Sequence, residues 1–485
     1  GFAFDGQETF TIYGGAGNEA IFGGYKADTI TGGDGNDYIF GGDGADSINA
    51  GAGDDVVYTS VAGLTEDTSI NGGAGSNTLV FDMPGESGGW DNESYGAVTF
   101  NLSSDLGNAS NFVNVGGGGS ADTLTGDTNN NVIIGAGGAD KLYGGDGNDS
   151  LYGDEHPNDT NGTTYGIRQS SLSDGNDELY GGAGDDILYA SDGDDKLDGG
   201  TGADTLTGGS GSNTFILRSG DGGSSQSAGD TITDFTDDSD SFGLDSLSFG
   251  SLTISQSGSD TTIKEGSNYL ATLTGITAST VTAVDFQSTS TTALTLSGTT
   301  GDDTLIGGAG GDTFNAGAES DTLYGWGGDD TFNISSKSGS YTDTINGGTG
   351  TNVLNISYVN GLSDFSISMI PTSDTTISLV DANGGTINFT NILDYTYTSG
   401  AAGYWEGSIT VNSKAYTFVT DMRYDKTPFS GAYGSVQAFV YENPSNTVEV
   451  VLPNTGKWLP QYRMSNYRGF AFDGQETFTI YGGAG

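Results

Sequence analysis

A single apolar position recurs every nine residues along much of this chain. In the first array the blocks begin at Gly14, Gly23, Gly32, Gly41 and Ala50, and each approximates G-G-x-G-x-D-x-U-x, where U is apolar. The apolar eighth position is occupied by Ile21, Ile30, Ile39, Ile48 and Val57. Glycine tolerates positive φ, so the first six residues of a block can form a tight loop. The last three residues suit a short strand with one inward side chain.

Two such blocks make one coil of strand, loop, strand and loop. Stacked coils would then form parallel sheets whose strands lie about 4.8 Å apart. The register is kept through three arrays, at 14–80, at 117–216 with an insertion at 153–171, and at 298–355. A flexible glycine-rich linker would not keep an acidic and an aliphatic residue in this register. The pattern predicts an all-β fold with three parallel β-rolls.

The sixth position of the block is nearly always acidic. Its aspartates are Asp28, Asp37, Asp46, Asp55, Asp122, Asp140, Asp149, Asp177, Asp186, Asp195, Asp204, Asp230, Asp303, Asp312, Asp321, Asp330 and Asp343. In a coil each of these carboxylates would stack on that of the next coil, and the two would repel unless a cation lay between them. Carboxylate and backbone carbonyl oxygens are the ligands that calcium prefers. We therefore expect multiple calcium ions between the loops, with these aspartates as metal ligands.

Composition supports a cation-dependent fold. The net charge is −51 and only 33% of the residues are hydrophobic, a combination that normally predicts disorder, yet the chain has 24 Tyr and 23 Phe. Bound cations would reconcile these numbers. The charge argues against nucleic acid as a partner, which needs basic patches. The chain has no cysteine, which excludes disulfides and thiolate zinc sites.

Outside the arrays the pattern changes to alternating apolar and polar residues, which favours antiparallel strands. We expect a β connector at 81–116, a β closing segment at 217–297 and a β-sandwich-like domain at 356–468. The apolar runs, such as 132–134 and 450–452, are too short to be transmembrane segments.

A second, much longer period is also present. Residues 469–485 repeat residues 1–17 letter for letter, an offset of 468. Either tandem modules of this length follow one another or the segment is duplicated artificially, and we favour tandem modules. Residues 1–13 would then be the end strand of a module junction and 469–485 the start of the next module. Because residue 1 is not Met, we expect the sequence to be an internal piece of a longer protein.

Catalytic constellations are not evident. The one histidine, His156, cannot form an H-E-x-x-H zinc site, and acidic pairs such as Asp185 and Asp186 fall in the calcium register. The chain is therefore predicted not to be an enzyme. Trp326 replaces a glycine in a loop, where it could cover a neighbouring domain or make a contact between modules or chains.

The arrays resemble the RTX (repeats-in-toxin) family of type I-secreted proteins. Residues 229–235, GDTITDF, are similar to the segment that closes such arrays, and residues 98–102, VTFNL, resemble inter-array segments of large RTX proteins. The resemblance implies calcium between the turns, secretion of an unfolded chain and folding outside the cell, with the sixth-position aspartates as ligands. Glu19 departs from this pattern, as do the residues that replace the fourth-position glycine, namely Lys26, Ser120, Asn129, Glu319 and Tyr341. We expect weaker sites near 19–28, 321 and 343.

Together these features suggest a structural role. We expect an extracellular, cell-surface protein that assembles with itself into a surface-layer sheet or a filament, with cell-surface polysaccharide as a further candidate partner. The alternative is an extender or ligand-binding module of a giant RTX adhesin. An enzyme whose catalytic domain lies elsewhere would require non-repeated sequence outside the 468-residue period.

Overall fold

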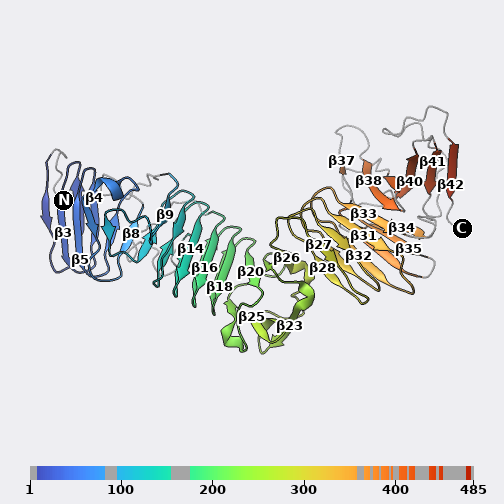
Figure 1. The fold of residues 1–485 in the computed structure, drawn as a ribbon, viewed down its shortest axis with the longest axis horizontal. Coiled ribbons are helices and arrows are strands. Elements are labelled where there is room, and N and C mark those ends of the chain that lie inside the picture. Colours follow the sequence, from blue (N-terminus) through green and yellow to red (C-terminus); the bar gives the residue numbers. More distant parts are fainter. Residues whose placement is uncertain are drawn as a thin grey trace. The chain divides into compact units, whose positions relative to one another are not determined.

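The computed structural model describes residues 8–81, 96–154, 175–357 and 384–392, and the backbone of further strands between residues 365 and 481. His156 and most of the predicted insertion lie outside the described residues. The chain forms two compact units, one of residues 1–247 and 251–285, the other of residues 248–250 and 286–485. Figure 1 shows the stacked strands of each unit.

The first unit opens with coils whose strands alternate between two parallel sheets. One sheet has the order β1 (Thr11–Tyr13), β3 (Thr29–Asp34), β5 (Ser47–Ala52), β7 (Ser69–Asn71) and β10 (Ala109–Ser110). The other begins with β2 (Ala20–Gly24), β4 (Tyr38–Gly42), β6 (Val56–Tyr58), β8 (Thr78–Val80) and β11 (Asn114–Gly116). Apolar eighth positions pair in register, as in Ile12↔Ile30 and Ile30↔Ile48. The short helix α1 (Gly63–Glu66) is inserted between β6 and β7.

The second array continues the sheet that contains β11. That sheet goes on through β13 (Val132–Ile134), β15 (Ser150–Tyr152), β17 (Ile187–Asp192), β19 (Thr205–Ser210) and β21 (Asp230–Ile232). The facing strands are β9 (Thr99–Asn101), β12 (Thr123–Thr125), β14 (Lys141–Asp146), β16 (Glu178–Ala183), β18 (Lys196–Thr201), β20 (Thr214–Arg218) and β22 (Ser241–Asp245).

The connector between the first two arrays differs from the expected antiparallel structure. Its strand β11 pairs in parallel with both β8 and β13, and β9 pairs in parallel with β12. The reason lies in the side chains, because Phe100 and Val115 supply the buried apolar position that a coil needs even though the nonapeptide is absent. The first two rolls therefore share one continuous sheet, while the facing sheet is interrupted between β10 and β9.

The closing segment has the expected antiparallel pairing only in part, because β21 and β22 pair in parallel with β19 and β20 of the roll. Three strands, β23 (Leu252–Ser257), β24 (Asp260–Glu265) and β25 (Asn268–Leu273), form an antiparallel meander, and β25 joins β21 in parallel. The remaining short elements are the 3₁₀ turns η1 (Gln226–Ala228), η2 (Phe249–Ser251) and η3 (Ala283–Asp285), and the strand β26 (Phe286–Ser288).

In the second unit the third array forms another two-sheet roll. One sheet contains β27 (Thr295–Ser297), β29 (Thr313–Asn315), β31 (Thr331–Ser335) and β33 (Val353–Ser357), followed by β38 (Tyr404–Val411), β39 (Lys414–Thr420), β40 (Val436–Asn443), β41 (Thr447–Val451) and β42 (Thr477–Tyr481). The other contains β28 (Thr304–Ile306), β30 (Thr322–Tyr324), β32 (Thr342–Asn346), β36 (Thr386–Thr390), β35 (Thr375–Asp381) and β34 (Phe365–Pro371). The small strand β37 (Tyr395–Thr396) pairs with β38.

Most strands beyond residue 356 pair antiparallel, as the alternating pattern predicts. They also extend the two sheets of the third roll, since β38 joins β33 and β36 joins β32, both in parallel.

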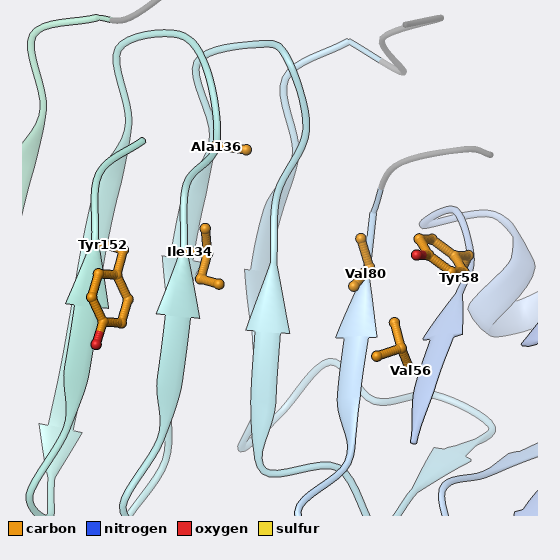
Figure 2. Packing of buried hydrophobic residues seen from close by; sticks show 6 residues of the cluster. All are labelled: Val56, Tyr58, Val80, Ile134, Ala136 and Tyr152. Atoms are coloured by element: carbon orange, nitrogen blue, oxygen red, sulfur yellow. The ribbon is translucent and has the colours of Figure 1, made fainter. Parts of the chain in front are cut away.

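The core consists of the inward eighth-position side chains. Ile39, Leu142 and Phe332 have no exposed surface. A second apolar cluster fixes the place where the first two arrays meet. Val56, Tyr58 and Val80 from the first array lie in this cluster with Ile134, Ala136 and Tyr152 from the second (Figure 2). Burying Val56, Val80 and Ile134 contributes about 1.5–3 kcal/mol for each side chain, which stabilises the contact between the two arrays.

Candidate calcium sites between the loops

The loops are close-packed along the stack, and this explains the glycines. Gly33, in the second position of its block, has φ +127°, and a Cβ there would lie 2.1 Å from the carbonyl oxygen of Gly15 in the preceding coil. Gly35, in the fourth position, has φ +117° and would place a Cβ 1.9 Å from the oxygen of Gly17. A side chain is therefore excluded both by backbone conformation and by space.

Non-glycine residues occupy this geometry at a few loops. Ala136, Ser191 and Trp326 have positive φ at the second position, and Glu319 has φ 62° at the fourth. The four other residues that replace the fourth-position glycine do not have positive φ, so Lys26 and Tyr341 carry no left-handed backbone strain. Their loops adopt a different backbone at this point.

The sixth-position side chains form two hydrogen-bonded ladders in each roll. The backbone N–H of Asp28 donates to Oδ1 of Asp46 at 2.7 Å, and that of Asp37 donates to Oδ1 of Asp55 at 2.9 Å. In the second roll the ladders run through Asp122, Asp140, Asp177, Asp195 and Asn213, and through Asn131, Asp149, Asp186, Asp204 and Asp230. In the third roll they run through Asp312, Asp330 and Asn352, and through Asp303, Asp321 and Asp343. The structure thus brings the predicted aspartates together coil by coil.

The second carboxylate oxygen distinguishes the interior loops. Oδ2 is buried and has no hydrogen-bond partner at Asp37, Asp46, Asp55, Asp140, Asp149, Asp186, Asp195, Asp204, Asp330 and Asp343. It points toward the first glycine of its own block, since a Cβ on Gly32 would lie 2.4 Å from Oδ2 of Asp37. A buried carboxylate oxygen without a partner is costly, and a hard cation is the partner that such an oxygen accepts.

Burial also perturbs the acidity of these groups. Desolvation raises the pKa of Asp46, Asp204 and Asp330 to about 7 and that of Asp140 to about 8, with neighbouring carboxylates adding to the effect. The backbone N–H donors oppose this rise without cancelling it. Near neutral pH a positive charge close to these four carboxyls therefore favours their ionised form.

The carboxylates alone do not complete a metal site. Among the described residues, no three acidic or histidine side chains converge on one point. Calcium takes six to eight oxygen ligands and readily uses backbone carbonyls, which the tight loops supply in numbers. The donor set therefore fits calcium: one or two carboxylates with several carbonyls. When bound, the ion would neutralise the ladder and tie one coil to the next.

Loops at the start of a ladder are different. The second-position N–H of such a loop turns inward and donates to Oδ2, from Gly24 to Asp28 at 2.7 Å and from Gly118 to Asp122 at 2.8 Å. Asp312 and Asp303 receive equivalent bonds at 2.8 and 2.5 Å, and Glu19 receives one from Gly15 at 3.0 Å. Because both oxygens of these aspartates are occupied, we expect them to bind calcium more weakly than the interior aspartates.

Several acidic residues of the ladders lie outside the nonapeptide pattern, so they could not be identified from the sequence repeat. Asp67 accepts the N–H of Asp46 at 2.9 Å, and Asp240 accepts that of Asn213 at 2.8 Å. Asp67 lies 21 residues after Asp46 because α1 lengthens the coil, which removes it from the nine-residue register. Asp221 is 8% exposed and its charge raises the pKa of both Asp204 and Asp230. No repeat signal marks Asp221.

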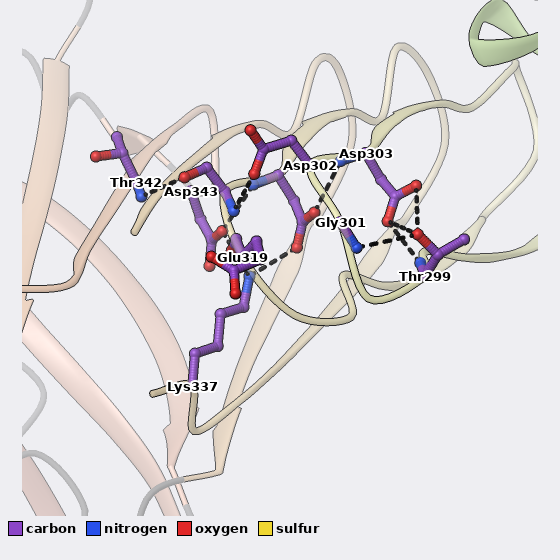
Figure 3. Close-up of polar contacts among 10 residues, drawn as sticks. Thr299, Gly301, Asp302, Asp303, Glu319, Lys337, Thr342 and Asp343 are labelled. Atoms are coloured by element: carbon purple, nitrogen blue, oxygen red, sulfur yellow. Dashed lines mark hydrogen bonds and ion pairs between the residues drawn. The ribbon is translucent and has the colours of Figure 1, made fainter. Parts of the chain in front are cut away.

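Asp321 and Asp343 have a different partner from the other ladder aspartates. The ammonium of Lys337 lies between them (Figure 3) and is 2.6 Å from a carboxylate oxygen of each.

Comparison with known proteins agrees with this geometry. A family model of the RTX calcium-binding nonapeptide repeat, spanning four copies, matches residues 11–25, 22–57, 116–154, 172–206, 189–222 and 295–333. No curated protein matches the chain.

The search of solved structures found two further similarities, each to a part of this chain. The R3 subunit of the mannuronan C5-epimerase AlgE6 from Azotobacter vinelandii is 27% identical, with 34% of this chain and 77% of that chain covered and a TM-score of 0.13. The extracellular lipase LipA from Serratia marcescens is 14% identical, with 53% and 67% covered and a TM-score of 0.19.

RTX nonapeptide repeats bind multiple calcium ions and are typical of secreted proteins. In the described part of the chain, no helix has the length and apolar character needed to cross a bilayer. The matched repeats coincide with the coils that carry the aspartate ladders. The chain therefore contains RTX calcium-binding nonapeptide repeats over these residues.

Proposed function

We propose that this chain is a calcium-dependent extracellular structural protein that assembles with itself, as a surface-layer sheet or a filament, from tandem modules. The proposal rests mainly on a five-residue strand sequence that is present at both ends of the chain. Residues 9–13 and residues 477–481 both read TFTIY. The first copy provides β1, which pairs with β3 at one end of its sheet, and the second provides β42, which pairs with β41 at the end of another.

A strand has two hydrogen-bonding edges, so one strand can serve both sheets. In the first copy the carbonyl of Phe10 accepts the N–H of Thr29, and the N–H of Gly14 donates to Thr31. Backbone groups of successive residues alternate between edges, so those of residues 9, 11 and 13 point away from β3. In a tandem array those groups would pair with β41 of the preceding module.

The shared strand would make one continuous sheet across the module junction. It would also remove an exposed strand edge from each module, which is otherwise prone to unspecific pairing. Stability should then grow with module number, as in other repeat proteins. The partner of each module is another copy of itself.

Disulfide trapping in a protein of two linked modules tests the shared strand. The chain has no cysteine of its own. Thr479 is in register with Glu449, and its equivalent Thr11 is in register with Thr29. Cysteine at Thr479 should cross-link with cysteine at Glu449, and in a separate variant with cysteine at Thr29 of the following module.

The matched control places cysteines at Tyr441 and Thr479, because Tyr441 lies one strand further away, opposite Glu449. Two strand spacings are about 9.6 Å, beyond the reach of a disulfide. Cross-linking to only one of the two partners would contradict a shared strand. Electron microscopy of the same protein separates the two roles: ordered sheets or fibres support assembly, whereas separate beaded chains favour the adhesin extender.

A further inference from the structure

Lys337 is buried inside the third roll, at a place where the other ladders have only carboxylates. Its side chain is 2% exposed and those of Asp321 and Asp343 are fully buried. Lys337 lies between β31 and β32, in a coil where the ladder aspartates are 22 residues apart instead of 18. The extra residues allow the lysine to fold back into the loop stack.

The ammonium group has a complete set of acceptors. Nζ donates to Oδ2 of Asp321 at 2.6 Å, to Oδ1 of Asp343 at 2.6 Å and to the carbonyl oxygen of Glu319 at 2.8 Å (Figure 3). An ammonium has three donors, so all of them are used. The ring of Tyr341 lies 5.1 Å from Nζ and adds a cation–π contact.

These acceptors are the kind that a calcium ion takes in such a roll. Two are carboxylate oxygens of successive ladder aspartates, and the third is a fourth-position carbonyl of the loop. In the opposite ladder of the same roll, Oδ2 of Asp330 is buried and has no protein partner. Among the described residues, this is therefore the one coil in which a positively charged side chain of the protein contacts the carboxylate oxygens of ladder aspartates.

The other lysine that forms a side-chain ion pair among the described residues does not resemble Lys337. Lys141 pairs with Glu178 on the outer face of a sheet and its side chain is 47% exposed. That pair bridges two strands and touches no ladder aspartate, so the arrangement at Lys337 is not the general behaviour of lysine in this fold.

We propose that Lys337 takes the place of a calcium ion, as a tethered cation, at the coil of Asp321 and Asp343. The gap between Asp321 Oδ2 and Asp343 Oδ1 is then bridged without metal, while the interior coils of the other ladders depend on calcium. Asp321 and Asp343 form a latent calcium site that opens only when the lysine is removed. This inference is independent of whether modules assemble.

The decisive variant is Lys337→Ala in the full chain, which removes the ammonium and leaves room for an ion. Lys26→Ala is the matched control, because Lys26 is also in a loop but is exposed. Calcium stoichiometry is measured by equilibrium dialysis, and hydrogen exchange of residues 321–346 is followed in excess chelator with a stabilising osmolyte that keeps the calcium-free chain folded. The alanine variant at 337 should bind one more calcium ion per chain than the parent or the control.

In chelator, residues 321–346 should stay protected in the parent and lose protection in Lys337→Ala, with calcium restoring it. The double variant Lys337→Ala with Asp343→Asn should lose the additional ion. Unchanged stoichiometry and unchanged protection in Lys337→Ala would overturn the proposal.

A second measurement covers the case in which Lys337→Ala does not fold. Asp343→Asn is then made in the parent, where Lys337 is present. If the lysine holds the site, this variant binds as many calcium ions as the parent. Loss of one ion would show that Asp343 ligates calcium beside the lysine and would overturn the proposal.

Discussion

The substitution Asp186→Asn should change the free energy of unfolding in opposite directions with and without calcium. It is 1% exposed, its Oδ1 accepts the N–H of Asp149 at 2.7 Å, and its Oδ2 has no protein partner. Asparagine would keep the first interaction, because Asn77 and Asn352 accept the same ladder bond at 2.9 Å. Asp186→Asn therefore removes one negative charge and leaves the ladder connected.

With calcium present, the substitution should destabilise the protein. If the site is lost at a calcium concentration about 100 times its Kd, the loss is about 2.7 kcal/mol. Without calcium the effect should reverse. Burial raises the pKa of Asp186 to about 6, so the folded state disfavours the ionised form at pH 8. Asparagine removes that penalty, worth about 1–2 kcal/mol after allowance for solvent screening.

The free energy of unfolding is measured by urea titration at pH 8, in saturating calcium and in excess chelator with a stabilising osmolyte. Asp122→Asn is the control, because both oxygens of Asp122 accept backbone N–H groups. It should cost about 1–3 kcal/mol in both conditions. An equal loss for Asp186→Asn with and without calcium would refute the assignment of its Oδ2 to the metal.

Three further predictions concern pH, loop packing and module number. In chelator with a stabilising osmolyte, the protein should be more stable near pH 4 than at pH 8. The raised pKa values of Asp46 and Asp140 mean that the folded state holds more protons than the unfolded state between about pH 4 and 8, so stability falls as pH rises. Urea titrations across this range check it, and a flat profile would contradict it. Gly200→Ala should lower the Tm in calcium well beyond Gly220→Ala: both glycines have positive φ, but a Cβ on Gly200 would lie 2.1 Å from the oxygen of Gly182, while one on Gly220 would have no neighbour within 4 Å. Equal Tm values for the two variants in calorimetry would contradict the explanation that close packing between coils excludes a side chain at Gly200. Two linked modules should melt at a higher temperature than one at fixed calcium, and identical melting curves would count against the shared strand.

Much of the fold could be predicted from the nine-residue register. The apolar eighth position of each block points inward, as Ile30 and Leu206 show, and the glycines adopt the positive φ that their positions require. The ladder of sixth-position aspartates follows from the same period. These features are local and recur in every block, so each block separately predicts the same loop and strand geometry.

The rest depended on contacts that no local pattern encodes. Phe100 and Val115 complete coils without a nonapeptide, so the expected antiparallel connector is in fact part of the parallel stack. Asp67 joins a ladder only because α1 lengthens its coil. The weak sites expected at Asp321 and Asp343 were inferred from the missing glycines, whereas the structure places Lys337 there through a long-range fold of the chain. The difference between ladder-start and interior aspartates likewise arises from neighbouring coils.

The central claim is that calcium between the loops completes this fold, because a chain of net charge −51 has buried carboxylate oxygens without protein partners. The most direct measurement is far-ultraviolet circular dichroism of the full chain at pH 8, in excess chelator and after calcium is restored. Metal binding and folding should be coupled, so the β signal should fall sharply in chelator and return with calcium. A full β signal that persists in chelator would contradict the account.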